Sequence, residues 1–441
     1  MFRRTTIFSI ALLGCASAIA ATGTNAPAWV GAWGYSASPN PPGQSPAAPN
    51  GSVVPLAAPP AAAPPSSNAP LLDNPGKLPV DTGNAELTNV TIRQIVRVSA
   101  EGNAVRLRLT NENGVEPLSL GAVRVGLAGP DGEIVPGSDH AVTFAGHEGV
   151  VIPAGAPLLS DTINLPVKAL DRLAISLYAP DRLTARGARS LFQYISGTTG
   201  DQTGAAHLPG VKLARAPALV SQVEVAATRP TQAIVTLGDS ITEGAGSTAN
   251  GFRGWPDRLA ERLAARPGKS RWSVVNAGIS GNRLLRYGSG PSALARFDRD
   301  VLSVPGVKVL ILMEGINDIG RGFTTSGSVE PAPAEALQAA QRQIVERAHA
   351  HGIRVIGVTL TPYKGAGYWA DKGEAARQAM NDWIRTSGTF DGVIDFAGVV
   401  ADRGDPLTFD PRFNDTDHLH PNDAGYRAMG DAVDLKMVTG E

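Results

Sequence analysis

The chain has 441 residues, which at about 150 residues per domain leaves room for two or three domains. Its 39 Lys and Arg nearly balance 40 Asp and Glu, and the net charge of −1 argues against a nucleic-acid-binding surface. The 50 Gly and 34 Pro indicate many turns and loops, which argues against an all-helical fold.

The first 20 residues form a predicted export signal. Arg3 and Arg4 precede an apolar run at 7–20, which ends in small residues of the kind that signal peptidases cleave after. The run is shorter than the roughly 18 apolar residues of a spanning helix, and no comparable run follows, so we expect no integral membrane span. We therefore predict a secreted or periplasmic protein from which 1–20 is removed. The alternative is a lipoprotein anchored through Cys15, the only cysteine.

A segment rich in Pro and Ala follows at residues 39–79. It contains 13 of the 34 prolines and almost no charged or aromatic residue. Such a composition cannot bury enough apolar surface to offset the entropy of ordering the chain. We therefore predict a flexible, solvated insert, with a mucin-like stalk or a surface-contact arm as alternatives.

Residues 88–178 show the alternation that is typical of half-buried strands. At 105–109 and 123–127 apolar residues recur at every second position, and further predicted strands follow at 134–135, 141–144, 150–152 and 173–178, with Gly, Pro and Asp between the runs. This spacing favours an antiparallel sandwich, to which the strand-like segment at 29–35 also belongs. The prediction is an N-terminal antiparallel β-sandwich domain at 21–225, with the insert at 39–79 after its first strand.

Beyond residue 225 the pattern changes to strands that alternate with helices. We predict strands at 234–237, 273–275, 309–313, 354–360 and 393–396, and helices from about 255, at 334–351 and at 373–385. This alternation favours a parallel sheet with helices on both faces. In such a sheet the reactive groups collect at the carboxyl ends of the strands. Residues 226–441 are therefore predicted to be a catalytic α/β domain.

Polar residues follow three of these strands and recur near the C-terminus. They occupy residues 238–244, 276–282, 314–318 and 417–421. A serine on a tight turn, a distant Asp and His, and Gly or Asn donors together supply a nucleophile, a base with its orienting group, and an oxyanion site.

These four segments, in this order within residues 232–435, resemble the conserved blocks of the SGNH, or GDSL-type, hydrolase family. The resemblance implies a flavodoxin-like three-layer α/β/α domain, no metal or other cofactor, and ester hydrolysis through a serine nucleophile. The chain lacks the Gly-x-Ser-x-Gly motif, so the nucleophile elbow of the α/β-hydrolases is not expected.

The resemblance also implies a role for each site residue. It makes Ser240 the nucleophile, His420 the general base and Asp417 the residue that orients His420. The oxyanion hole would combine the backbone N–H groups of Ser240 and Gly278 with the side-chain amide of Asn317. The chemistry is reasonable because a neutral imidazole must take the proton of a hydroxyl at neutral pH, and a carboxylate fixes its tautomer. Gly278 suits a donor because it lacks a Cβ that would block close approach.

Other interpretations of these segments are weaker. The Asp and His residues at 415–420 could form the metal site of a phosphoesterase, but no further His or Cys group at ligand spacing accompanies them, so no metal is predicted. Asp239 is predicted to be structural and to hold the turn around Ser240. Phe252 and Trp255 could line an acyl or sugar site, although helix packing is the role we predict for Trp255.

The function we expect is that of a secreted serine carboxylic ester hydrolase acting on short-chain acyl esters of small molecules or polysaccharides, with carbohydrate O-acetyl groups among the candidates. One alternative is a lipase or thioesterase acting on longer acyl chains. The other is a noncatalytic surface or carbohydrate-binding protein on the same scaffold. Neither a nucleic-acid partner nor a cofactor is expected, and the sequence predicts no oligomeric state.

Overall fold

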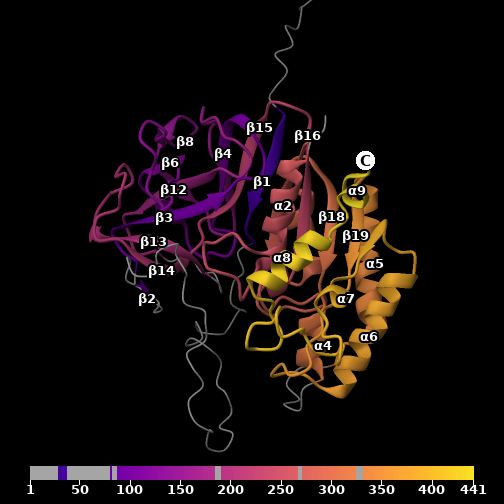
Figure 1. The fold of residues 1–441 in the computed structure, drawn as a ribbon. Coiled ribbons are helices and arrows are strands. Elements are labelled where there is room, and N and C mark those ends of the chain that lie inside the picture. Colours follow the sequence, from indigo (N-terminus) through magenta and orange to yellow (C-terminus); the bar gives the residue numbers. More distant parts are fainter. Residues whose placement is uncertain (1–27, 37–79, 82–86, 184–189, 267–270, 324–330) are drawn as a thin grey trace, which may run out of the picture.

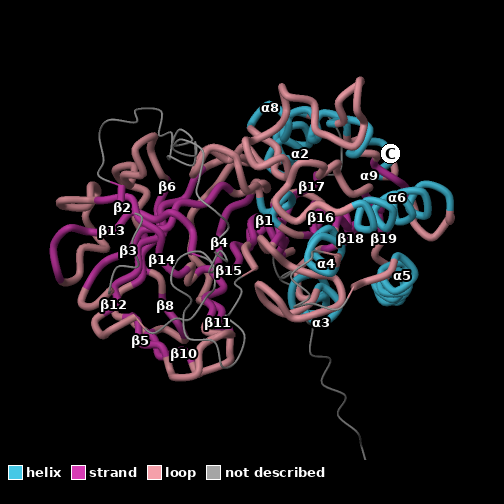
Figure 2. Tube along the Cα trace, turned by 90° about the horizontal axis from the view of Figure 1, so that it is seen from below, coloured by secondary structure: helices cyan, strands magenta, loops and turns pink. Residues whose placement is uncertain are grey.

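The computed structural model describes residues 28–36, 80–81, 87–183, 190–266, 271–323 and 331–441 (Figure 1). The predicted export signal at 1–20 and the Pro-rich insert at 39–79 lie outside these residues. Strands dominate one half of the molecule, and a sheet accompanied by helices forms the other half (Figure 2).

The first half, which we call the β domain, comprises the described residues between 28 and 227 and contains two larger sheets. An antiparallel sheet has the order β1-β15-β4-β11, formed by Trp29–Gly34, Val220–Ala227, Gly102–Thr110 and Pro157–Leu159. The second sheet has the order β2-β14-β13-β3-β12-β6-β7, formed by Val80–Asp81, Lys212–Pro217, Ser190–Thr199, Val90–Arg97, Arg172–Ala179, Val123–Leu127 and His140–Ala141. Two short ribbons pair β5 with β10 and β8 with β9, at Leu118–Leu120, Val150–Ile152, Thr143–Phe144 and His147–Glu148.

Alternating apolar residues from both larger sheets enter one hydrophobic cluster. The shared residues include Val105, Leu107 and Leu109 of β4 and Leu173, Ile175 and Leu177 of β12. The period-two pattern at 105–109 thus marks a strand with one face in the core. We propose that the two sheets pack face to face as the predicted sandwich.

The strands β13, β14 and β15 were not predicted from the sequence. In β15 polar residues such as Gln222 and Glu224 are buried along with their apolar neighbours. Residues 222–225 do alternate polar and apolar, so a period-two signal was present beyond residue 178, where the predicted series of strands ended. Conversely, the predicted strand at 134–135 is only an isolated bridge, between Ala128 and Ile134.

The second half, which we call the α/β domain, comprises the described residues from 231 onward and contains a five-stranded parallel sheet. Its order is β17-β16-β18-β19-β20, formed by Arg271–Gly278, Thr231–Gly238, Val307–Met313, Arg354–Val358 and Gly392–Ile394. All five predicted strands are present, and the order 2-1-3-4-5 is that of the flavodoxin-like doubly wound fold. β15 ends at Ala227 and β16 begins at Thr231, and we propose that the domain boundary lies between them.

Helices cover both faces of this sheet (Figure 1). Side chains of α5 (Ala334–Ala350) and α6 (Asp371–Thr386) join one hydrophobic cluster, and those of α2 (Trp255–Ala265) and α8 (Asp423–Ala432) join another. Leu310 and Leu312 of β18 belong to the first cluster, whereas Val309, Ile311 and Met313 belong to the second. The domain therefore has three layers, as predicted. The shorter helices are α1 (Ser240–Glu243), α3 (Ala293–Phe297), η1 (Asp298–Leu302, a π-helix), α4 (Ile316–Gly322), α7 (Phe396–Val400) and α9 (Leu435–Thr439).

The two domains meet where β1 lies against the edge strand β17. Ser273 Oγ donates to Gly31 O at 2.6 Å, and Ser99 Oγ donates to Val274 O at 2.9 Å. A Cβ on Gly34 would lie 2.4 Å from a methyl group of β17, so glycine allows this close approach. β1 therefore connects the sheet of one domain to the sheet of the other.

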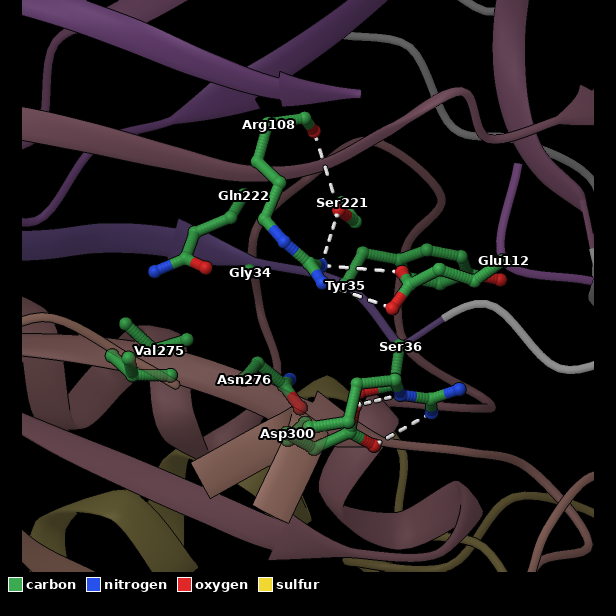
Figure 3. A pocket seen from close by; sticks show the side chains of 13 residues that line it. Gly34, Tyr35, Ser36, Arg108, Glu112, Ser221, Gln222, Val275, Asn276 and Asp300 are labelled. Carbon is green, nitrogen blue, oxygen red and sulfur yellow. Dashed lines mark hydrogen bonds and ion pairs between the residues drawn. The ribbon is translucent and has the colours of Figure 1, made fainter. Parts of the chain in front are cut away.

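A small polar cavity of about 30 Å³ lies beside this contact (Figure 3). Arg108 donates to both carboxylate oxygens of Glu112, at 2.9 and 3.2 Å, and to Ser221 Oγ at 3.0 Å. A second ion pair, between Arg299 and Asp300, lines the cavity from the α/β domain. Because the volume holds about two water molecules, this cavity is a polar seam between the domains rather than a ligand site.

Candidate active site

Ser240 lies at the sharp turn between β16 and α1. A side chain on Gly238, the last residue of β16, would lie 2.4 Å from Met313 O of the neighbouring strand, so the turn requires glycine there. Asp239 caps the helix by accepting the Ile241 N–H at 2.9 Å, which is the structural role predicted for it. Ser240 is thereby held at the carboxyl edge of the sheet.

A continuous hydrogen-bonded chain joins the three residues that the sequence analysis selected as the triad. Ser240 Oγ lies 2.7 Å from His420 Nε2, and His420 Nδ1 lies 2.5 Å from Asp417 Oδ2. Because the carboxylate can only accept, Nδ1–H donates to Asp417, and Nε2 is left to accept the hydroxyl proton of Ser240. The structure thus brings together residues that are 180 positions apart in the sequence.

The charge on Asp417 is stabilised by this arrangement. Burial raises the pKa of its carboxyl, but the hydrogen bond and charge of His420 and two backbone N–H groups outweigh burial and lower that pKa to about 2. Those N–H groups, from Leu419 and His420, donate to Oδ1 at 3.0 and 2.9 Å. Asp417 is therefore ionised at neutral pH and available to stabilise an imidazolium.

Residues 414–422 hold His420 in position. The Asp415 N–H donates to His420 O at 2.8 Å, which closes the turn that carries the imidazole. His418 has a left-handed backbone, with φ of 58°, and its ring contacts Asn414 instead of joining the triad. Within the ranges that the structure describes, no group of three or more His, Cys, Asp or Glu is arranged to hold a metal ion.

Asn317 supplies an unpaired donor at the same edge of the sheet. It lies in the first turn of α4, which directly follows β18, the strand beside β16. Its Oδ1 is 3.4 Å from the Tyr368 hydroxyl, which can donate to it. Its Nδ2 is buried and has no acceptor among the described residues. A buried amide donor without a partner is suited to a ligand or a reaction intermediate that brings an acceptor.

Gly278 differs from its predicted role. Its N–H donates to Asn276 Oδ1 at 2.8 Å, so this donor is engaged within its own turn. Gly278 is needed for packing, because a Cβ there would lie 2.3 Å from the backbone nitrogen of Glu243 in α1. The glycine three residues later, Gly281, has φ of 74°, and its N–H has no acceptor in the described part of the chain. The sequence analysis did not select Gly281, although the Gly-x-x-Gly spacing within 276–282 was a visible signal.

One family match covers all of these positions. Residues 236–428 match the sequence model of the GDSL-like Lipase/Acylhydrolase family. The α/β domain is a GDSL domain. The resemblance seen in the sequence is therefore confirmed, and the domain belongs to a family of hydrolases. No curated protein matches the chain in sequence.

Solved structures resemble this GDSL domain over about half of the chain. One is a lipolytic protein of the G-D-S-L family from Desulfitobacterium hafniense, with 24% identity, covering 46% of this chain and 97% of that one, at a TM-score of 0.35. The aryl esterase of M. smegmatis has 15% identity, covering 46% and 95%, at 0.36. An acetyl xylan esterase from Geobacillus stearothermophilus has 21% identity, covering 48% and 96%, at 0.37.

Two buried carboxyl groups lie beside Ser240 in the GDSL domain. Asp239 and Glu314 follow Gly238 and Met313, which are paired in register between β16 and β18. One oxygen of each, Oδ2 and Oε2, is buried without a hydrogen-bond partner among the described residues. Burial raises the pKa of Asp239 to about 6, and burial together with the charge of Asp239 raises that of Glu314 well above its ordinary value. Glu314 therefore resists ionisation next to Asp239.

A buried arginine ties the turns of the site together, and sequence reasoning missed it. Arg296 is 1% exposed and donates to Gly238 O at 2.8 Å, Ala277 O at 2.6 Å and Asn282 Oδ1 at 2.9 Å. It also pairs with Asp300 at 2.8 Å. In sequence an Arg and an Asp four residues apart are typical of a solvent-exposed helix pair, so nothing in the pattern indicated burial.

Proposed function

We propose that the GDSL domain is a serine carboxylic ester hydrolase that cleaves short-chain acyl esters. The observation that supports this proposal is the unbroken chain of hydrogen bonds from Ser240 Oγ through His420 to Asp417. A hydroxyl in contact with an imidazole that is itself oriented by an ionised carboxylate is the arrangement needed to activate an oxygen nucleophile.

In the first half-reaction Ser240 Oγ attacks the ester carbonyl carbon while its proton passes to His420 Nε2. The carbonyl electron pair moves to oxygen and gives a tetrahedral oxyanion. Collapse of this intermediate breaks the bond to the alcohol oxygen, which leaves with the proton held by His420. Asp417 stabilises the imidazolium throughout without taking its proton.

Three donors are proposed to stabilise the oxyanion. Ser240 is the first residue of α1, so its backbone N–H has no acceptor within the helix. Asn317 offers its unpaired Nδ2. As the third donor we favour Gly281 over Gly278, because the Gly278 N–H is already bonded to a neighbouring side chain. A Cβ built on Gly281 would lie 3.8 Å from Arg321 Nη2, one helical turn beyond Asn317, which supports its placement at this site.

The second half-reaction regenerates the enzyme. Water gives a proton to His420 Nε2 and attacks the acyl carbon, and the resulting oxyanion occupies the same three donors. Collapse of the second intermediate breaks the bond to Ser240 Oγ, which recovers its proton from His420. The products are the free alcohol and the carboxylic acid.

The surroundings of the triad favour a short acyl group. The cleft that reaches Asp417 and His420 has a mixed lining, in which polar and charged side chains alternate with apolar ones and form no continuous apolar wall. A long alkyl chain would remove these groups from water without offering them hydrogen bonds, which is unfavourable. A lipase with a long-chain preference would instead need an extended apolar wall.

Export of the protein is a second part of the proposal and rests on the sequence. The basic residues Arg3 and Arg4 and the apolar run at 7–20 support it. Within the described ranges, no helix combines the length and hydrophobicity needed to cross a membrane. N-terminal sequencing of the protein recovered outside the cytoplasm should begin near residue 21. Retention of residues 1–20 would contradict export by cleavage, and a lipid-modified Cys15 would identify a lipoprotein.

The central test is hydrolysis of p-nitrophenyl esters from acetate to palmitate, with Ser240→Ala measured beside wild type. We expect the fastest turnover on acetate and butyrate and its loss in Ser240→Ala. Ser387→Ala, an exposed serine at the end of α6, is the matched control and should retain activity. Turnover that survives Ser240→Ala would contradict the serine mechanism, and preference for palmitate would indicate a lipase.

A further inference from the structure

A cleft of about 430 Å³ lies between the β domain and the GDSL domain and extends to the triad. Asp417 and His420 line part of it. The β domain contributes Trp33 of β1, Tyr35 just after that strand, and Arg97 of β3. Its volume lies within the range of small-molecule binding sites. A ligand that reaches the triad through this cleft therefore touches both domains.

The loop at 244–253 forms the opposite wall of the cleft, and it is held in position by contacts at two places. The ring of Phe252 lies 5.2 Å from the guanidinium of Arg97 and 5.4 Å from that of Arg172, and its backbone has a left-handed φ of 53°. Nearer to the triad, Thr248 donates its backbone N–H and its hydroxyl to Asp423 at 2.8 and 2.7 Å. The cleft is thus preformed, which lowers the entropy lost when a ligand binds.

Both arginines that line the cleft in the described part of the chain are paired with carboxylates of the same chain. Arg97 pairs with Asp257 at 3.2 Å and with Glu261 at 2.9 Å. Arg253 pairs with Asp423 at 3.4 Å. Both arginines are thus compensated, and Glu243, Asp415 and Asp417 add carboxylates to the lining, so the cleft disfavours an anionic ligand. An uncharged ligand that carries hydroxyl groups can donate hydrogen bonds to carboxylates of this lining.

The same cleft combines aromatic surface with hydrogen-bonding groups. Trp33 is half-buried, and Asn250 Nδ2 is buried without a partner among the described residues. A sugar ring presents C–H groups on its faces and hydroxyls around its edge, so it can stack on an indole while giving Asn250 an acceptor. An alkyl chain would leave that amide unpaired.

We propose that this cleft binds the alcohol portion of the ester and that this portion is a neutral carbohydrate, with Trp33 of the β domain as a specificity-determining residue. The inference rests on the proposed esterase activity. It gives the β domain a direct part in substrate selection, because the domain supplies one wall of the site rather than a separate binding surface.

The test compares kcat/KM for partially acetylated xylooligosaccharides, triacetin and p-nitrophenyl acetate in wild type, Trp33→Ala and Trp29→Ala. In Trp33→Ala the ratio of kcat/KM for the sugar ester to that for p-nitrophenyl acetate should fall about tenfold, mainly through a higher KM. Trp29 is the matched control, since it lies on the same strand with its ring under Arg106 at 4.3 Å and does not line the cleft. Its replacement should leave the ratio unchanged.

A second measurement keeps the inference testable if Trp33→Ala does not fold. Unacetylated xylotriose should inhibit hydrolysis of p-nitrophenyl acetate competitively in wild type, and more weakly in Trp33→Phe.

The outcomes separate the carbohydrate assignment from the esterase activity. Absence of inhibition, or an unchanged ratio of kcat/KM values in Trp33→Ala, would overturn the carbohydrate assignment, while serine-dependent turnover of p-nitrophenyl acetate would still support the esterase. An equal loss on triacetin and on the sugar ester would also overturn it and indicate a glycerol-type alcohol. Failure of the esterase itself would show as no Ser240-dependent turnover on any ester.

Discussion

Two buried polar side chains, Arg93 of the β domain and Asn317 of the GDSL domain, differ in how far their hydrogen bonds are satisfied. Arg93 of β3 donates to Ser176 Oγ at 2.8 Å and to three loop carbonyl oxygens, and burial lowers its pKa to about 10. Asn317 of the GDSL domain keeps its Nδ2 unpaired. A buried group whose hydrogen bonds are all made holds the surrounding loops in place. A buried donor that is left unpaired at the sheet edge can instead bind an acceptor of the substrate or of a reaction intermediate.

The strongest test of this contrast is His420→Ala. Removing the base should lower kcat on p-nitrophenyl acetate by about 10⁴-fold or more, while the free energy of unfolding changes by less than about 1 kcal/mol. His351→Ala serves as the control, since His351 is exposed and bonds only to a backbone carbonyl at the end of α5. A kcat within a few fold of wild type in His420→Ala would contradict the assignment of His420 as the general base.

Arg93→Met should show the opposite pattern. It leaves buried carbonyl oxygens without a donor, so we expect a loss of about 3–5 kcal/mol in the free energy of unfolding, measured by urea titration. The kcat of the protein that remains folded should match wild type. Arg403→Met, at an exposed position, should change stability by less than about 0.5 kcal/mol. A loss of kcat in folded Arg93→Met would show that the two roles are not separable.

Two buried asparagines of the GDSL domain allow an unpaired side chain to be compared with a hydrogen-bonded one of the same residue type. Asn317→Ala should lower kcat by about 10²–10³-fold with little change in stability, because it removes an unpaired donor. Asn381 accepts the Leu360 N–H at 2.7 Å and donates to Leu360 O at 2.8 Å, so both its amide oxygen and its amide nitrogen are hydrogen-bonded. Asn381→Ala should lower the free energy of unfolding by about 1–3 kcal/mol and leave kcat intact. Reversed outcomes would contradict both assignments.

The smallest expected effect is on the pH dependence of stability. Burial raises the pKa of both Asp239 and Asp318 from 3.8 to about 6, so the folded protein retains protons that the unfolded chain has released. Their contribution to stability is therefore full below pH 4 and is lost as the pH rises through 6, by about 1–3 kcal/mol for each group.

Urea titrations between pH 5 and 8 check this pH dependence. Asp239→Asn retains an acceptor oxygen for the Ile241 N–H but cannot ionise, so it should flatten the decline in stability. Asp410→Asn is the control. The Arg412 side chain and backbone lower the pKa of Asp410 to about 2, so that carboxyl stays ionised over the whole range. If the free energy of unfolding of Asp239→Asn fell with pH as steeply as that of wild type, the assignment of Asp239 as a titrating group would be contradicted.

Much of the catalytic arrangement could be predicted because it depends on local sequence patterns. The parallel strands have uninterrupted apolar runs, and polar segments follow them, so the sheet edge that carries Ser240 and Asn317 was predictable from the sequence. The engagement of the Gly278 N–H by Asn276 was not, because it depends on a side-chain rotamer. The burial of Arg296 depends on contacts with two strands and a loop, none of which its neighbours in sequence indicate.

The β domain was less predictable because its partners are distant in the chain. β15 pairs with β1 and β4 and is buried on both faces, so the polar and apolar alternation at 222–225 does not mark a solvent-facing side of the strand. The cleft is harder still to predict, since residues near 33, 97 and 250 become neighbours only after both domains have folded and packed together.

The position of β1 also sets an order for biosynthesis. Trp29 pairs with Ala226, and β1 then packs on β17, so this strand has no partner until more than half of the chain has been made. At roughly 5–20 residues per second that interval is on the order of 10 s or longer. His420 emerges later still. Whether the chain emerges from the ribosome or, as proposed, from an export channel, its N-terminal part comes first, so the cleft wall built on β1 can form before the catalytic base is available.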